Sequence, residues 1–399
     1  MIKNGIRNNL FYPLMLIIFT SSRKIILLGI NKITDLDNSL ILTLIMFFSE
    51  FIFGLILYVR QIKFISKKKQ KTFLGIELIY EPIEIAGPDS NLKIIILIFF
   101  TTFFDFIEFV LKTYYLPKKI KLSNINISAT LDIRLNNQIA IFLAIFCFCL
   151  LKFPILRHQI FSLTIISICL IIIILFEYYV MEKNEENPLL FTFILFLIIL
   201  DSFFISLKDI ITKYILEYNY INIFKLVMLE GLFGFIISII YSLILHFIIK
   251  ENIFEEISEY INNKHSITLL IHFLILYFIL SGFKNTYRTV TIYLFSPMTR
   301  IFTDSIIDPA LILYYYFIEN DFLINDEQNL YYFITNLIIS IIIVFCGFIY
   351  NEICVLFCCD LERDTYCEVT KRSKKYEQSI DSWLGESTNN IPIDEKDAN

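Results

Sequence analysis

Charged side chains lie inside most of the long apolar stretches of this chain, where they could bind or conduct a polar solute. In chain order they are Glu50, Asp105, Glu108, Asp132, Arg134, Asp201, Lys208, Asp209, Glu230, Lys284, Arg288, Arg300 and Asp304. A charge in a lipid bilayer is costly, so it normally faces protein or a water-filled cavity. Many helices with charged faces therefore favour a polar interior. Two apolar stretches, Gln159–Phe176 and Gln328–Asn351, carry no charge and predict helices at a lipid-facing periphery.

The composition indicates a membrane protein. Of 399 residues, 57% are hydrophobic and 18% are charged, whereas a soluble domain has about 25% charged residues. Apolar stretches long enough for ~30 Å of hydrocarbon recur along the chain. We expect an all-α polytopic membrane protein with ten transmembrane helices. They are predicted at about residues 10–28, 39–60, 93–114, 129–151, 156–177, 189–214, 222–249, 267–288, 297–318 and 329–352.

Loop charges and the order of the helices predict the topology. The loop over 60–92 is rich in lysine, which favours the cytosolic side. An even number of spans then places both termini in the cytosol, with 354–399 as a polar, partly disordered tail. The two charge-free helices end residues 1–178 and 179–353, and this equal position predicts two inverted five-helix repeats.

The start of the ninth predicted helix is the most specific local signal. Ser296 is a good N-cap residue and Pro297 suits the first helical position, so a helix should begin there. Arg300 and Asp304 follow with Asp308 at spacings of four, which places them on one helical face. They could form a cavity wall, or an ion-pair ladder that fixes this helix to its neighbours.

Acidic residues in three other helices are candidates for coupling transport to protons or for lining a cavity. Glu50 is alone in the middle of its predicted helix, and Asp105 and Glu108 share one face of theirs. Buried carboxyl groups suit proton or cation coupling. Glu230 precedes Gly231, and the glycines at 231 and 234 predict close packing against another helix.

The eighth and sixth predicted helices carry the remaining candidates. Asn285 and Arg288 lie about one turn apart and could bind an anionic solute, or could lie at the cytosolic surface. Lys284 is interpreted as reaching toward that surface. Lys208 and Asp209 are consecutive, so they should point in different directions and are placed near the membrane edge.

Motifs for catalysis or metal binding are absent from the sequence. We find no P-loop, nucleophile elbow or zinc spacing, and the four histidines are scattered. We therefore expect no enzyme activity, no catalytic residue, no metal, no cofactor and no nucleic-acid partner. Asn126 begins a glycosylation sequon, and Cys354–Cys359 lies where membrane proteins are acylated; use of either site stays open.

Several segments taken together resemble the drug/metabolite transporter superfamily, and in particular the solute carrier 35 F-type and chloroquine-resistance-transporter-like proteins. The segments are Phe104-Asp105, the residues around Arg134, and residues 225–234, 282–285, 287–291, 296–304 and 347–352. The resemblance implies ten helices in two inverted repeats, alternating access, and a central cavity lined mainly by helices 1–4 and 6–9. It also implies functional roles for Arg134, Glu230 and Arg300.

Two functions are compatible with these observations. The first is a secondary-active transporter for a small polar solute in an endomembrane such as the Golgi, lysosome or vacuole. Its expected lining is Glu50, Asp105, Glu108, Arg134, Glu230, Asn285, Arg288, Arg300 and Asp304. The second is a non-transporting membrane scaffold or receptor in which the same charges form interhelical salt bridges. The expected partners are the lipid bilayer and the solute, while proton coupling and a homodimer stay open.

Overall fold

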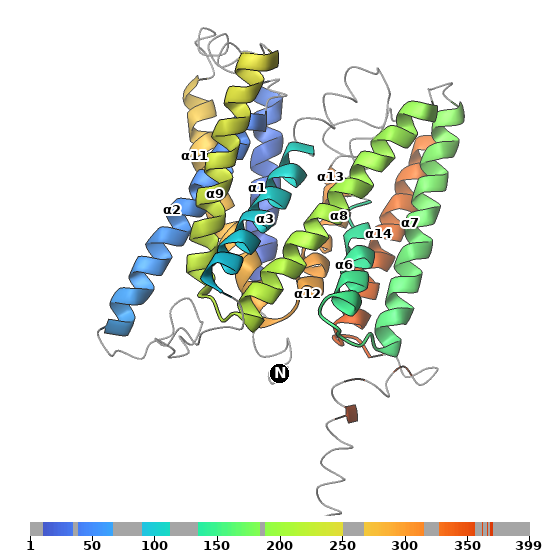
Figure 1. The fold of residues 1–399 in the computed structure, drawn as a ribbon. Helices are drawn as coiled ribbons and strands as arrows, with labels where there is room; N and C mark the ends of the chain where they lie inside the picture. Colours follow the sequence, from blue (N-terminus) through green and yellow to red (C-terminus); the bar gives the residue numbers. More distant parts are fainter. Residues whose placement is uncertain are drawn as a thin grey trace, which may run out of the picture.

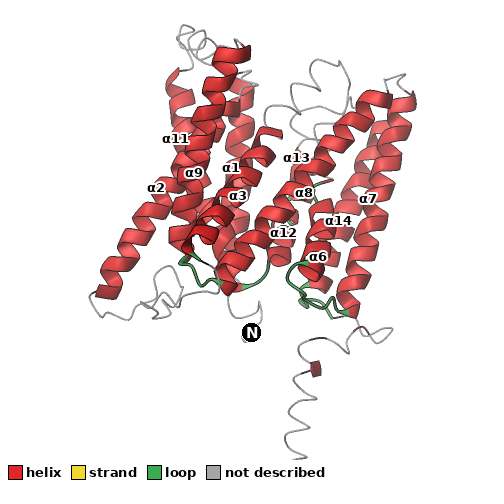
Figure 2. Ribbon diagram, in the orientation of Figure 1, coloured by secondary structure: helices red, strands yellow, loops and turns green. Residues whose placement is uncertain are grey.

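The computed structural model describes residues 11–34, 39–66, 90–111, 135–183, 188–249, 267–314 and 327–355, with residues 361, 365, 368 and 369. Over this part of the chain the fold is all-helical and contains no strand (Figure 2). The helices are α1 (Phe11–Thr34), α2 (Ser39–Ser66), α3 (Asn91–Val110), α6 (Gln138–Cys149), α7 (Arg157–Lys183), α8 (Pro188–Tyr218), α9 (Ile223–Ile244), the π-helical turn η3 (Leu245–Ile249), α11 (Ile267–Leu294), α12 (Pro297–Ser305), α13 (Asp308–Tyr314) and α14 (Glu327–Tyr350).

Five helices are long and apolar enough to cross a membrane, as judged by length and composition within the described residues. The crossing segments are Leu40–Lys63, Arg157–Tyr179, Ile223–Phe247, Thr268–Leu294 and Phe333–Tyr350. This agrees with the prediction of an integral membrane protein in contact with lipid. Helices lie in each of the ten stretches that the sequence predicts as spans, but α6 has only 12 residues.

The helices form a row of packed pairs across the bundle (Figure 1). At one end α2 packs against α9, and at the other end α7 packs against α14. Between them, α1 packs against α11 and α3 packs against α8, while α12 contacts α1, α6, α8, α11 and α14. The helices that contain the two charge-free stretches, α7 and α14, thus lie together at one edge and expose apolar side chains such as Ile168, Ile171 and Ile341.

Glycines bring α2 and α9 into backbone contact. A Cβ on Gly54 would lie 2.5 Å from the backbone nitrogen of Met228, and a Cβ on Gly231 would overlap the backbone of Phe51. The predicted close packing at Gly231 is therefore confirmed. Because neither helix can carry a larger side chain at these points, the two helix axes are fixed against each other.

The ninth predicted span, at about 297–318, is interrupted near Pro309, where the sequence allows a kink. Ser296 caps α12 by accepting a hydrogen bond from the Thr299 backbone N–H at 3.0 Å, and Pro297 occupies the first turn, as predicted. The helix ends at Ser305, and α13 begins at Asp308. Pro309 explains the break, because its ring cannot pack against the carbonyl four residues earlier and it donates no hydrogen bond.

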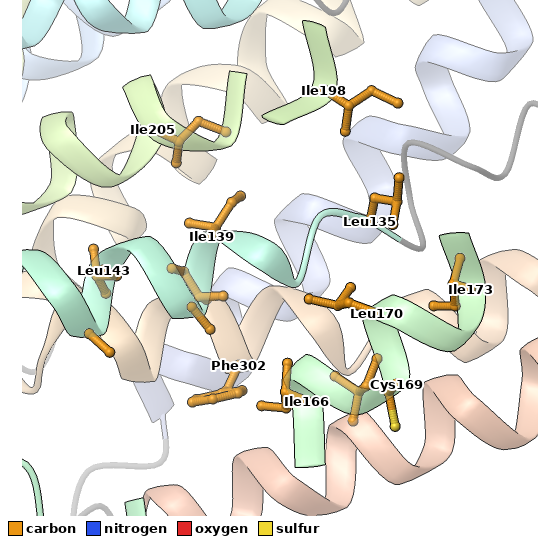
Figure 3. Packing of buried hydrophobic residues seen from close by; sticks show 14 of the residues in the cluster. Leu135, Ile139, Leu143, Ile166, Cys169, Leu170, Ile173, Ile198, Ile205 and Phe302 are labelled. Carbon is orange, nitrogen blue, oxygen red and sulfur yellow. The ribbon is translucent and has the colours of Figure 1, made fainter. Parts of the chain in front are cut away.

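Apolar packing joins α6, α7, α8, α12 and α14 into one cluster (Figure 3). Ile139 and Leu143 of α6, Ile166 and Leu170 of α7, and Phe302 of α12 all belong to this cluster. This contact seats α12 on the α7–α14 end of the bundle. It positions the charged face of α12 toward α8, α11 and α1.

Candidate functional site

Six buried charged residues form a continuous chain through the bundle, which we call the buried ion-pair chain. Its members, in spatial order, are Lys208, Asp105, Arg288, Asp209, Arg300 and Asp304, and each is at most 8% exposed. They come from α3, α8, α11 and α12. Three cations alternate with three carboxylates, so the chain is neutral as a unit.

The first half of the chain connects α3 with α8 and α11. The Lys208 ammonium nitrogen lies 2.5 Å from Oδ1 of Asp105, and Nη1 of Arg288 lies 3.6 Å from the same oxygen. Arg288 Nη2 donates to Oδ1 of Asp209 at 2.8 Å. Consecutive residues of α8 thus reach different partners, as the sequence predicted for Lys208 and Asp209.

The second half of the chain connects α8 with α12. Arg300 Nη1 donates to Oδ2 of Asp209 at 3.0 Å. Arg300 Nη2 also lies 3.2 Å from Oδ2 of Asp304, one helical turn further along α12. The predicted i,i+4 pair is confirmed. Asp209 therefore receives two guanidinium groups, one from each side, and is fully buried.

Polar side chains of α1 and of the turn before α6 extend the chain toward the helix break. Thr20 donates to Oδ1 of Asp304 at 3.3 Å, and the Lys24 ammonium lies 3.7 Å from Oδ1 of Asp308. Asn137 donates to Oδ2 of Asp308 at 3.4 Å and accepts from Ser305 at 2.5 Å. The turn at 136–137 therefore contacts the α12–α13 break.

Polar groups without a hydrogen-bond partner line one face of α11. Among the described residues, the Tyr277 hydroxyl, the Ser281 hydroxyl, Nδ2 of Asn285 and Nε of Arg288 are buried and have no partner. Spacings of four, four and three place them on one side of the helix. Buried polar groups are nearly always hydrogen-bonded to protein, water or ligand. This face is thus suited to contact with water or a polar solute.

Glu50 and Glu230 lie outside the ion-pair chain. They are 1% and 2% exposed and belong to α2 and α9. Glu230 Oε1 accepts from the Thr212 hydroxyl at 3.5 Å, while Oε2 of Glu50 has no hydrogen-bond partner within the described part of the chain. Neither carboxyl group has a cation within 4.0 Å there.

The remaining predicted lining residues are less central or cannot be placed. Asn285 is buried on α11, and Glu108 is half-buried on α3. Arg134 lies outside the described residues, as do Asn126 and the end of the Cys354–Cys359 segment. The structure thus brings Asp105, Arg288, Arg300 and Asp304 into one ion-pair chain.

The sequence interpretation placed Lys208 and Asp209 near the membrane edge, and their depth in a membrane stays a prediction. Within the bundle both side chains are buried, and α8 continues to Tyr218, four residues beyond the predicted end of the span. Likewise α11 continues to Leu294, about 15 Å beyond Lys284. Lys24 and Asp308 were not among the predicted lining residues either. The basic residues Arg23 and Lys24 inside the first predicted span were the signal for Lys24.

Comparison with known proteins adds no assignment: no protein-family model and no curated protein sequence matches this chain. The resemblance to drug/metabolite transporters therefore rests on the residues of the sequence itself.

Proposed function

We propose that this chain is a secondary-active transporter that moves a small polar solute by alternating access through the interior of the bundle. The observation that supports this most is the buried ion-pair chain, which draws charges from several helices into one interior region. Replacing such pairs by apolar residues is often neutral or stabilising, so stability alone does not account for them. Charged residues inside a membrane bundle usually mark the route of a solute or ion.

The pattern of helix contacts supports ten spans in two inverted five-helix repeats. Take α1, α2, α3, α6 and α7 as the first repeat, and α8, α9, α11, α12–α13 and α14 as the second. Exchanging equivalent helices turns the α1–α11 contact into the α8–α3 contact, and α2–α11 into α9–α3. It also turns α6–α8 into α12–α1, and α6–α7 into α12–α14. The α2–α9, α6–α12 and α7–α14 contacts map onto themselves.

This symmetry suggests which helices move. In the proposal, α2–α9 and α7–α14 are the two ends of the bundle, and the helices between them supply every member of the buried ion-pair chain. Rocking of these helices would open one side and close the other, as in other transporters built from inverted repeats. The α12–α13 break, where Asp308 meets Lys24, provides a point at which the ninth span can bend.

The ion pairs of Asp209 are the proposed closed gate. They hold α8 to α11 and α12 through Arg288 and Arg300. A polar solute that reached this region could exchange contacts with these groups and with the unpartnered face of α11. Breaking and remaking the same pairs would link solute binding to rocking.

A scaffold or receptor remains the second candidate, and the pairing itself favours it. Every charge in the ion-pair chain has an opposite partner, as interhelical locks require. The unpartnered polar face of α11 distinguishes the two functions, because a static lock gives no reason to bury Ser281 and Asn285 without partners. We therefore favour transport. An endomembrane location, cytosolic termini and a homodimer remain predictions.

Uptake by purified protein in lipid vesicles tests the proposal. Vesicles are offered a panel of labelled amino acids, sugars, nucleosides and organic cations, with and without a pH gradient. We expect saturable uptake of at least one class, and loss of that uptake in Asp209→Asn. The matched control is Glu217→Gln, which removes a carboxylate of α8 that pairs with Lys213 at a partly exposed position. Folded protein that moves nothing in the panel would favour the scaffold.

A further inference from the structure

Two buried carboxyl groups lie on the most closely packed helix pair of the bundle, one on each helix. Glu50 of α2 and Glu230 of α9 are both almost fully buried. Gly231, next to Glu230, lies against the backbone of Glu50 and Phe51, so the two chain segments touch. Gly54 makes the equivalent contact from α2. The backbone segments that carry the two carboxyl groups are therefore in direct contact.

The same short pattern surrounds both carboxyl groups. Residues 50–54 read Glu-Phe-Ile-Phe-Gly, and residues 230–234 read Glu-Gly-Leu-Phe-Gly. Both place Phe three residues and Gly four residues after the acid. In the proposed repeats α2 and α9 are equivalent helices, so the two acids occupy equivalent positions on either side of the symmetry axis.

The charges that face this carboxyl pair do not neutralise it. Three charged residues interact electrostatically with both groups: Asp105 of α3, Lys208 of α8 and Arg288 of α11. Lys208 is already bound to Asp105 at 2.5 Å, and Arg288 is bound to Asp209 at 2.8 Å. The buried ion-pair chain is neutral, so its cations are already balanced and none is left over for Glu50 or Glu230.

Hydrogen bonds do not account for both groups either. Glu230 accepts from Thr212, and Thr101 also lies within hydrogen-bonding reach of it. The second oxygen of Glu50 has no partner among the described residues, although the side chain is only 1% exposed. A metal ion is a poor explanation, since no group of three or more metal-ligating side chains occurs in the described ranges.

We infer that Glu50 and Glu230 form a proton-exchange site that couples the proposed transport to protons, an inference that rests on the proposed function. Two like charges in a water-poor interior cannot both be ionised without a counter-ion, so at least one proton resides on the pair. Loss of that proton passes it to water and leaves a carboxylate. The Lys208 side chain can then move from Asp105 to the new carboxylate.

This transfer links the proton to the gate. Once Lys208 leaves Asp105, the Asp105 carboxylate can form a closer ion pair with Arg288. This weakens the ion pair between Arg288 and Asp209, which joins α11 to α8. Protonation of the pair returns Lys208 to Asp105. The proton would thus alternate with the ion pairs that join α3, α8 and α11.

Infrared difference spectroscopy of the purified full chain tests the site without any solute. At neutral pH we expect the band of a protonated, buried carboxyl group in the wild type, and loss of that band on alkaline titration. Glu50→Gln and Glu230→Gln should each remove or shift it, whereas Glu217→Gln should not. A wild type without the band, or a band unchanged in both glutamine variants, would overturn the inference. Either glutamine variant alone decides the matter if the other does not fold.

Vesicle uptake separates failure of the site from failure of the proposed function. For a solute that the wild type accumulates under a pH gradient, Glu50→Gln should abolish gradient-driven accumulation but keep exchange of labelled for unlabelled solute. Unchanged gradient-driven accumulation in both glutamine variants would overturn proton coupling. If the wild type moves no solute, the coupling falls with the proposed function, while the infrared result still shows whether the carboxyl pair holds a proton.

Discussion

Replacing Asp209 by Asn tests whether the buried ion-pair chain holds the helices together. Asp209 is fully buried and binds Arg288 at 2.8 Å and Arg300 at 3.0 Å. Asparagine has nearly the same shape but no charge. Two buried guanidinium groups would then share a single neutral acceptor, and the interior would carry an excess positive charge.

The expected loss of stability follows from the burial of these groups. Removing one partner of a buried ion pair typically destabilises a protein by about 3–5 kcal/mol. The Asn side-chain oxygen still accepts one hydrogen bond, so we expect a loss of about 3 kcal/mol. For 399 residues, an unfolding entropy of about 2.1 cal/mol/K per residue gives about 0.8 kcal/mol/K. The melting temperature should therefore fall by about 4 °C.

Thermal unfolding of the purified full chain in one detergent measures this shift. The control is Glu217→Gln, which removes the partner of Lys213, because the Glu217 side chain is 37% exposed. Lys213 is buried, but it keeps three backbone carbonyl acceptors when Glu217 is replaced, so the control should shift by less than Asp209→Asn. Asp209→Asn combined with Arg300→Gln restores neutrality and should recover part of the loss.

The reasoning is refuted if Asp209→Asn melts like Glu217→Gln. That result would mean that Asp209 is solvated or not bound to the arginines. Additive effects in the double variant would also contradict coupling between Asp209 and Arg300.

Three further changes probe the fold with the same melting assay. Gly231→Leu should prevent correct folding, because the new side chain would overlap the backbone of Phe51. In the control Gly29→Ala, the new methyl group meets only the edge of the Phe273 ring at 3.1 Å, so this variant should fold. Equal behaviour of the two variants would contradict the α2–α9 contact. Ser296→Ala should cost about 1 kcal/mol through loss of the α12 N-cap, and an unchanged melting temperature would argue against that cap. Lys213→Met should lower the free energy of unfolding by about 2 kcal/mol, because three backbone carbonyls at the end of α11 lose hydrogen bonds of 2.9–3.2 Å from the Lys213 ammonium. Unchanged stability would show that these carbonyls bind water instead.

The sequence was informative about helices because apolar length is a local property. Each predicted span contains a helix, and the start of α12 at Pro297 follows from two adjacent residues. The break after Ser305 was partly visible in Pro309, but only the structure shows that the helix ends there. The number of membrane crossings and the domain limits at 178 and 353 remain predictions.

The pairing of charges could not be read from the sequence, because partners are far apart along the chain. Asp209 and Arg288 are separated by 79 residues, and nothing in the periodicity of either helix identifies the other. Helix ends were also hard to place. Helix α8 continues to Tyr218, about one turn beyond the predicted end of the span at 214.

The most direct test of the central claim is whether the interior becomes accessible to water from each side of the membrane in turn. A single cysteine is placed at Ser281, a fully buried residue of α11, in a chain whose eight native cysteines have been replaced. Membrane-impermeant thiol reagents are then applied to either face of the vesicles, with Ile168→Cys on the lipid-exposed side of α7 as the control. We predict labelling of position 281 from both faces, with a transported solute or a pH gradient shifting the balance, and little labelling at 168. A position 281 that reacts from neither face under any condition would contradict a transporter and leave a solid, locked bundle.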